Sequence, residues 1–187
     1  MPRTKLTKPE IVRAAVRAFR RRGYAATSMA QLAEATGLTK GAFYHHFPDK
    51  AAVMEAALAS TVAFAEERWF GPARDGRRGV TDRVDLMVDG ARALFREPDE
   101  GCFVANTALA GGPDAERFRP HLVAFADAWR AALASLARDA GLPDPRDFAL
   151  RTVADVEGGI VLMRIYGDGA HLEAALGRFR DNFPPAA

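Results

Sequence analysis

The residues from Lys40 to His45 place several polar side chains along one side of a short helical pattern. At about 100° per residue, with Phe43 at the centre of the buried face, Gly41 and His45 point nearly the opposite way, Tyr44 lies at the side and Lys40 at the edge. A lysine can reach O6 and N7 of a guanine, and tyrosine and histidine can donate to phosphate oxygens. The pattern predicts a DNA-reading helix. The alternative is a surface helix with incidental polar residues.

Three flanking residues complete this predicted site. Thr39 is expected to cap the helix and can contact a thymine methyl group or a phosphate, while Phe47 joins Phe43 on the buried side. Lys50 opens the following helix, whose free amides together with the ammonium group form a natural phosphate clamp. The small Gly41 leaves room for a base-pair edge.

A second helix precedes this one at the spacing of a helix-turn-helix motif. Ser28 and Gln31 form a capping box that opens a helix over 29–36. Gly37 supplies the positive φ of a tight turn before Thr39. Two short helices joined by a glycine turn predict a helix-turn-helix motif over 28–47.

Charge is divided unevenly along the chain. The first 50 residues carry ten Lys or Arg against three Asp or Glu, a net +7, so the remainder carries −5 of the overall +2. A basic N-terminal part followed by an acidic remainder favours a polyanionic partner for the N-terminal part. A solvated basic face is the alternative.

The whole chain is expected to be all-α, with about nine helices. Helical periodicity and Gly or Pro breaks predict a helix between Thr7 and Gly23, followed by helices over 29–36, 39–47, 49–70, 82–96, 102–109, 114–140, 146–166 and 171–183. Gly71-Pro72 is expected to end the fourth helix, and Pro120 to bend the seventh or split off its first turn. No segment shows sustained strand alternation.

Composition excludes several classes of protein. The chain has no apolar run of the ~18 residues needed to cross a bilayer and no apolar segment after its basic start. Its single cysteine, Cys102, rules out an internal disulfide framework and CxxC metal chemistry. We therefore expect a cytoplasmic protein with no membrane association, no metal and no cofactor. No Gly-rich phosphate loop, HExxH or GxSxG motif suggests an enzyme, although Cys102 near His121 in space stays an open alternative.

The segment from Ile11 to Leu58, and above all its core TKGAFYHHF, resembles the DNA-binding domain of TetR/AcrR-type transcriptional repressors. The resemblance implies that the helix over 39–47 is the recognition helix. It also implies that Ser28, Tyr44, His45 and Lys50 contact phosphates and that Thr39, Lys40 and Gly41 face bases.

The rest of the chain is implied to be a helical ligand-binding and dimerisation domain. The segments Gly101–Leu109 and Val156–Arg164 are similar to the LmrA/YxaF-like branch of that family. The expected organisation is a DNA-binding domain over 1–58 and a second domain over 59–187.

The last two helices are expected to form a homodimer. Leu172, Leu176, Phe179 and Phe183 make one apolar stripe that needs a partner, and Gly158-Gly159 suggests close helix approach. A four-helix bundle of two subunits would satisfy both features, whereas the alternative packs both stripes inside one subunit.

An apolar pocket among the fourth to eighth helices, between about 49 and 166, is the expected effector site. Most of its candidate residues are equally suited to the core, and a lone cysteine is more often a small buried hydrophobe. Asn106, His121 and Glu157 are favoured because a polar group in an apolar helix needs a partner. The candidates are Phe95, Cys102, Phe103, Asn106, Phe118, His121, Phe125, Trp129, Glu157 and Met163.

The expected function is a ligand-responsive repressor that binds a palindromic operator in double-stranded DNA as a dimer. A small, apolar effector would release it by favouring a conformer whose recognition helices are wrongly spaced. The alternatives are a non-sensing DNA-binding or protein-interaction module and an enzyme that uses the C-terminal pocket.

Overall fold

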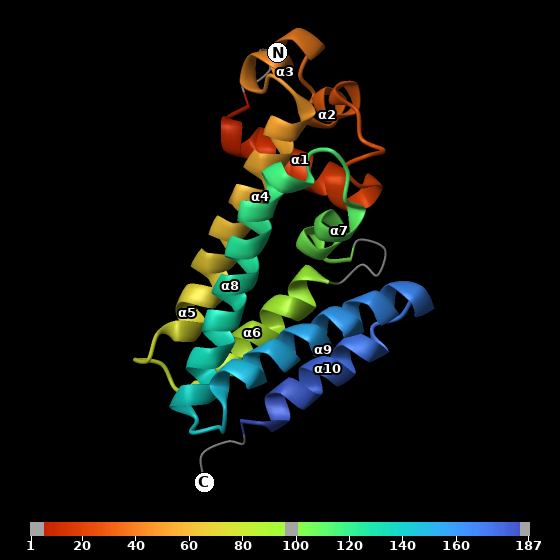
Figure 1. Ribbon diagram of the computed structural model, residues 1–187. Helices are drawn as coiled ribbons and strands as arrows, with labels where there is room; N and C mark the ends of the chain where they lie inside the picture. The colour runs from red at the N-terminus through yellow and green to blue at the C-terminus, as the bar shows by residue number, and fades with distance from the viewer. Residues whose placement is uncertain (1–5, 96–100, 184–187) are drawn as a thin grey trace. The chain divides into compact units, whose positions relative to one another are not determined.

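The structure is a computed structural model that describes residues 6–95 and 101–183, and those residues form helices without any β-strand (Figure 1). The α4, η1 and α5 segments are continuous, so the described chain has nine helical stretches and confirms the predicted all-α class. The elements are α1 (Lys8–Arg22), α2 (Met29–Thr36), α3 (Lys40–His46), α4 (Lys50–Ala65), the π-helical η1 (Glu66–Phe70), α5 (Gly71–Arg74), α6 (Val80–Leu94), α7 (Phe103–Ala110), α8 (Ala115–Asp139), α9 (Pro145–Tyr166) and α10 (Ala170–Asp181).

Most predicted helix ends agree with the structure to within two residues. The glycines at Gly23 and Gly37 end α1 and α2 with φ of 75° and 66°. Pro120 lies inside the continuous α8, so of the two expected effects the first turn is not split off. The predicted end of the fifth helix at Arg96 falls outside the described residues.

Internal contacts divide the chain into two compact units. The head unit comprises Met1–Val62 and Phe103–Leu122, and the body unit comprises Ala63–Cys102 and Val123–Ala187. The first segment of the head unit ends close to the predicted boundary at residue 58. The head unit is nevertheless larger than the predicted domain, because it includes α7 and the first turns of α8.

The hydrophobic core of the head unit explains this larger extent. Residues from α1 to α4, including the fully buried Ile11, Leu32 and Phe43, pack in one cluster with Phe103 of α7 and Phe118 of α8. Phe103 and Phe118 are therefore core residues of the head unit. Burying each such aromatic ring contributes roughly 2–3 kcal/mol.

In the body unit, α9 and α10 lie side by side as an antiparallel hairpin (Figure 1). The predicted stripe of α10 is buried inside the subunit, and Phe148 of α9 contacts the rings of Phe179 and Phe183 with centroids 6.4 and 5.7 Å away. The stripe from Leu172 to Phe183 therefore has its partner within the same chain, which corrects its assignment to the dimer interface.

The two neighbouring glycines of α9 behave differently. A Cβ atom on Gly159 would lie 3.0 Å from the carbonyl oxygen of His171 and 3.1 Å from Cα of Leu172. A Cβ on Gly158 would meet none of the described atoms within 4 Å. Gly159 thus allows α9 and α10 to approach closely inside one subunit. Gly158 serves no such contact there.

This difference predicts opposite effects of two alanine substitutions. Alanine gains about 1 kcal/mol over glycine inside a helix, so Gly158→Ala should raise the thermal unfolding midpoint or leave it unchanged. Gly159→Ala should lower the midpoint and reduce the free energy of unfolding by ~1 kcal/mol. The new Cβ would overlap the backbone of α10, which cannot move aside as a side chain would. Thermal unfolding, with the assembly state checked by light scattering, measures both. Equal shifts for the two variants would contradict this account.

The helix that begins at Lys50 continues through Gly71-Pro72, which corrects the predicted stop. The chain forms a π turn there, in which the amide of Gly71 donates to the carbonyl of Glu66, five residues earlier. A Cβ at Gly71 would lie only 2.8 Å from that oxygen, so glycine is needed. Pro72 is tolerated because it occupies the first turn of α5.

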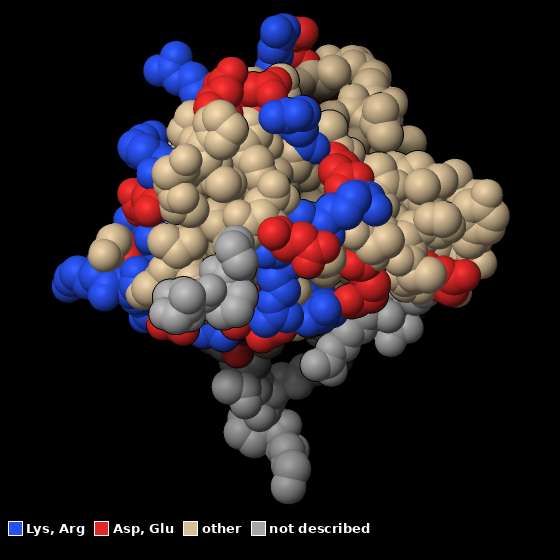
Figure 2. All heavy atoms as spheres, turned by 90° about the horizontal axis from the view of Figure 1, so that it is seen from below, with Lys and Arg blue, Asp and Glu red and all other residues tan. Residues whose placement is uncertain are grey.

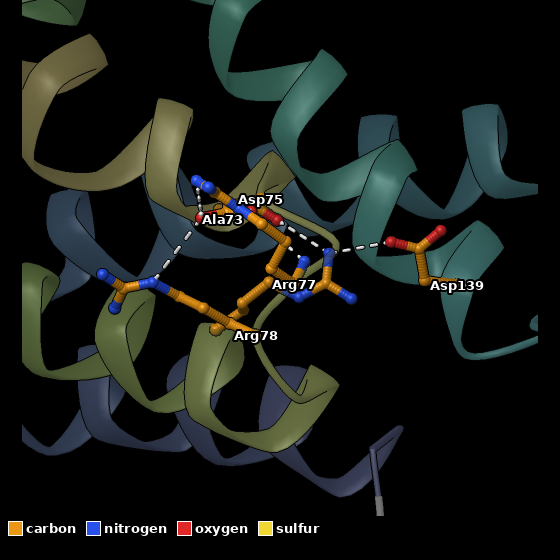
Figure 3. Close-up of polar contacts among 6 residues, drawn as sticks. Ala73, Asp75, Arg77, Arg78 and Asp139 are labelled. Carbon is orange, nitrogen blue, oxygen red and sulfur yellow. Dashed lines mark hydrogen bonds and ion pairs between the residues drawn. The ribbon is translucent and has the colours of Figure 1, made fainter.

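A buried arginine ties the start of α6 to the end of α8 within the body unit. Arg83 is 2% exposed, and its guanidinium donates to Asp139 at 2.7 Å and to the carbonyl of Ala73 at 3.3 Å. Nearby, Asp75 accepts from Arg77 in the exposed loop before α6, and this hydrogen bond lowers the pKa of Asp75 to about 2 (Figure 3). These contacts fasten the loop between α5 and α6.

Candidate nucleic-acid interface

The turn between α2 and α3 is built by local hydrogen bonds. The Ser28 hydroxyl accepts from the amide of Gln31 at 3.2 Å, and the Gln31 side chain accepts from the amide of Ser28 at 2.8 Å, so the predicted capping box is present. Gly37 adopts the left-handed conformation, and the amide of Leu38 returns to the carbonyl of Ala33 at 3.1 Å. The turn therefore holds α3 in a defined direction.

Buried aromatic rings fix the inner side of α3. Phe43 is fully buried and Phe47 nearly so, with ring centroids 5.7 Å apart. Thr39 caps the helix by accepting from the amide of Ala42 at 3.3 Å. The Lys8 ammonium stands 5.5 Å from the centre of the Phe47 ring and brings a positive charge from α1 to the end of α3. Nothing in the sequence pattern pointed to this neighbour.

The outer side of α3 is exposed at every position where a contact to DNA is predicted. Lys40, Gly41, Tyr44 and His45 are exposed, and Tyr44 is 44% accessible although it is a large aromatic residue. A Cβ on Gly41 would meet no atom of the described residues within 4 Å. A glycine inside a helix costs about 1 kcal/mol relative to alanine. The absence of an internal reason for Gly41 favours an external one, namely close approach of a partner.

Lys50 is held inside the head unit. Its ammonium group donates to the carbonyl of Tyr24 at 2.8 Å and lies 4.3 Å from the centre of the Tyr24 ring. Asp49 caps α4 by accepting from the amide of Ala52 at 2.6 Å. Lys50 therefore sits at the amide end of α4, as predicted, with an intramolecular partner that its position in the sequence did not reveal.

Further basic residues of the head unit lie on α1. Arg13 and Arg17 are exposed and border a shallow groove with Glu10 and Thr36. By contrast, Figure 2 shows a face on which Lys or Arg and Asp or Glu side chains are interspersed. A mixed face of that kind does not attract a polyanion as a basic surface does.

Comparison with known proteins assigns this chain to a family. A model for the tetR family of bacterial regulatory proteins matches residues 11–57, and a model for the C-terminal domain of LmrA/YxaF-like transcriptional regulators matches residues 81–177, just over half of the chain. The chain belongs to the TetR family of transcriptional regulators. Both parts of the resemblance drawn from the sequence are confirmed.

Individual relatives of this TetR-family chain match it over different lengths. The HTH-type transcriptional regulator TtgR of Pseudomonas putida is 48% identical over 54 residues, which cover 29% of this chain and only about a quarter, 26%, of TtgR. An uncharacterized HTH-type regulator of Bacillus subtilis, YxaF, is 23% identical over 164 residues and covers 83% of this chain and 84% of its own. These relatives are regulators of transcription rather than enzymes, so the enzyme alternative is set aside.

Solved structures of the TetR family share the fold. The crystal structure of a regulatory protein TetR from Rhodobacter sphaeroides has a TM-score of 0.83 at 22% identity and covers 96% of this chain and 100% of its own. A TetR regulator from Legionella pneumophila has a TM-score of 0.82 at 18% identity and covers 98% of this chain and 100% of its own. At these identities the likeness concerns the fold alone. No helix in the described parts of the chain is long and apolar enough to span a membrane.

The predicted effector-site residues of this TetR-family regulator fall into two groups. Phe103, Asn106, Phe118 and His121 belong to the head unit, and the body unit holds the remaining six. In the body unit, Phe125 and Trp129 contact each other at 6.2 Å between ring centroids. The six are Phe95, Cys102, Phe125, Trp129, Glu157 and Met163.

Two groups of contacts in the body unit were not expected from the sequence. Phe70 of η1 joins the pair on α8, with centroids 5.4 Å from Phe125 and 6.5 Å from Trp129. Cys102 is buried and hydrogen-bonds the Glu157 carboxyl group, whose other oxygen, Oε2, is buried without a hydrogen-bond partner. Met163 is a core residue of α9.

Burial raises the pKa of Glu157, and the hydrogen bond from Cys102 opposes this shift in part. A carboxyl group whose pKa is higher in the folded chain than in the unfolded one favours folding less as pH rises from the unfolded value through the folded one. The free energy of unfolding lost over this pH range is on the order of 1 kcal/mol for each unit by which the pKa is raised.

We therefore expect Glu157→Gln to be more stable than the wild type at pH 8 and to lose that advantage near pH 4, since an amide does not ionise. Urea denaturation at the two pH values measures the difference. Glu116→Gln is the matched control, because it makes the same chemical change on a side chain that is 85% exposed. A wild-type stability that rises between pH 5 and pH 8 relative to Glu157→Gln would contradict the assignment.

Proposed function

We propose that this TetR-family protein is a ligand-responsive repressor that reads a palindromic operator as a homodimer. The observation that carries the DNA-binding part is the division of α3 into two sides. Phe43 and Phe47 anchor the inner side, while Lys40, Gly41 and Tyr44 leave the outer side polar, open and unused by the protein itself. That combination suits a helix that enters the major groove.

Within this proposal the contacts divide into two kinds. Lys40 and Gly41 face base edges together with Thr39, and Ser28, Tyr44, His45 and Lys50 contact phosphates. Thr39 and Ser28 already use one side-chain lone pair each for capping, and a hydroxyl retains further capacity to donate. Phosphate contacts set the register, and base contacts set the sequence preference.

A gel shift with the chain's own upstream DNA tests the proposal. We expect a specific complex whose affinity falls steeply between 50 and 200 mM salt, because bound Lys and Arg side chains release condensed counterions. Unrelated DNA of equal length is the control. A complex with neither salt dependence nor preference for the upstream fragment would count against DNA reading.

The dimer part of the proposal rests on an exposed apolar face of α9. Leu150, Val161 and Ile165 are 53%, 48% and 67% exposed, and with Ala154 and Gly158 they follow the spacing i, i+4, i+8, i+11 and i+15. This set, the outer stripe, lies on the side of α9 opposite the residues buried against α10. A helix that is apolar on two opposite sides needs a second partner.

A second copy of the chain suits the outer stripe because a two-fold axis would pair α9 and α10 of both subunits in a four-helix bundle. Gly158 lies in the stripe without a contact inside the subunit. A dimer also matches DNA reading, since two-fold proteins contact half-sites about 34–36 Å apart.

The effector part of the proposal concerns the body unit. The rings of Phe70, Phe125 and Trp129 and the Cys102–Glu157 pair place aromatic surface and a buried acid in one unit, which favours a small, largely apolar effector. A protein that senses no ligand and only binds DNA is the alternative. Thermal unfolding with a panel of apolar compounds separates them, because a specific ligand raises the midpoint and lowers affinity for DNA. As a regulator of transcription, the protein is proposed to work in the cytoplasm.

A further inference from the structure

The Lys50 side chain is held at a defined place by Tyr24. Besides the hydrogen bond to the Tyr24 carbonyl at 2.8 Å, its ammonium lies 3.5 Å from the carbonyl oxygen of Ala25 and over the face of the Tyr24 ring. A lysine normally loses much rotamer freedom when it binds a phosphate. A lysine that is already held loses less and binds more tightly.

Tyr24 is held in turn by the start of α8. Its hydroxyl donates to Oδ2 of Asp114 at 2.6 Å, and its ring meets that of Phe118 edge-on at 5.1 Å. Burial and the hydrogen bond to Asp114 raise the pKa of Tyr24 above its ordinary value. The phenol therefore stays protonated and donates at any physiological pH.

A second tie joins the same parts of the head unit. Arg117, three residues after Asp114, contacts Asp49 at 3.5 Å and Glu55 at 2.7 Å. Asp49 caps α4 directly before Lys50. The segment that begins α8 thus holds the amide end of α4 directly through Arg117 and indirectly through Tyr24.

We propose that Tyr24 and Asp114 are positioning residues for Lys50. The Tyr24–Asp114 hydrogen bond fixes the ring and the carbonyl that hold the ammonium group, and the start of α8 thereby sets how well Lys50 meets a phosphate. The inference rests on the proposed function of Lys50 as a phosphate contact. It also gives the 103–122 segment a role in DNA affinity although no residue of that segment is assigned to touch DNA.

Chemical modification tests the positioning without DNA. The chain has only four lysines, Lys5, Lys8, Lys40 and Lys50, so mass spectrometry resolves the acetylation rate of each with an N-hydroxysuccinimide ester. We expect Lys50 to react more slowly than Lys40 in the wild type. Tyr24→Phe and Asp114→Ala should speed acetylation of Lys50 about three- to tenfold and leave Lys40 unchanged. An unchanged Lys50 rate in both variants would overturn the proposal.

Fluorescence anisotropy with the upstream DNA tests the consequence. Tyr24→Phe alone should weaken DNA binding about three- to tenfold relative to the wild type. Added to Lys50→Met, it should weaken DNA binding no further. Thr27→Val is the matched control, because it removes a hydrogen bond of the same loop, to the Gly23 carbonyl at 2.6 Å, without touching Lys50. Thermal unfolding of each variant shows whether the head unit remains folded.

The possible outcomes separate the two proposals. The loss of DNA affinity caused by Tyr24→Phe could persist in full in the Lys50→Met background, or Thr27→Val could cause the same loss. Either result would mean that Tyr24 has a purely structural role and would overturn the proposal that it positions Lys50. A wild type that binds the upstream DNA while Lys50→Met binds equally well would also overturn it and leave DNA reading intact. Failure of the wild type itself to bind would overturn both proposals, while the acetylation rates would still report whether Tyr24 holds Lys50.

Discussion

Val161→Asp is expected to convert the proposed dimer into folded monomers and to weaken operator binding by at least about 100-fold. Val161 lies in the middle of the outer stripe of α9 and is 48% exposed, so the subunit itself tolerates the change. In the dimer, two unpaired carboxylates would be buried near the two-fold axis, which costs several kcal/mol. Losing the second half-site then removes the gain from simultaneous binding.

Light scattering after size exclusion and anisotropy with the operator measure these two effects. Val123→Asp on α8 is the matched control, because Val123 is the same residue type and 49% exposed but lies outside the outer stripe. It should leave both mass and affinity unchanged. A dimeric Val161→Asp with wild-type affinity would exclude the outer stripe as the interface.

Lys40→Ala and Tyr44→Ala are expected to separate base reading from phosphate binding. Lys40→Ala should weaken the preferred operator by ~1–3 kcal/mol and also relax the preference for one base pair in each half-site. Tyr44→Ala should weaken all sequences by a similar factor, since a phosphate contact carries no base information. Neither residue contributes to the core, so both variants should fold normally.

The division between base reading and phosphate binding is tested by measuring the affinity of both variants for a set of operators. Each operator carries one altered base pair in every half-site. Tyr44→Phe keeps the ring and removes only the hydroxyl, so it isolates the hydrogen bond to phosphate. Arg146→Ala, which removes an exposed positive charge at the start of α9, controls for net charge. If Lys40→Ala and Tyr44→Ala lowered affinity equally for every operator, the assigned roles would be refuted.

Much of the head unit could be predicted because its signals are local. A capping box, a glycine with positive φ and a helical period of about 100° per residue depend on groups within four residues of one another. Ser28–Gln31, Gly37 and the inner position of Phe43 therefore agree with the structure. In the body unit, the π turn at Gly71 was not predicted, because an ordinary stop signal and a π turn begin with the same residues.

Pairing across long stretches of chain was decided only by the tertiary structure. The buried stripe of α10 showed that a partner was needed, but periodicity is the same whether that partner is Phe148 of the same chain or another subunit. For the same reason Asn106 and Glu157 looked alike as polar residues in apolar helices, yet they lie in different compact units.

For the DNA-reading face, the sequence by itself determined which side chains of α3 point outward, because rotation along one helix follows from residue order alone. Only the tertiary structure revealed that Lys50 is held by Tyr24, 26 residues earlier, and that Tyr24 is held by Asp114, 90 residues later. Such contacts arise where separate helices share one core. No local pattern encodes them, since each residue would look the same in the sequence with a different neighbour.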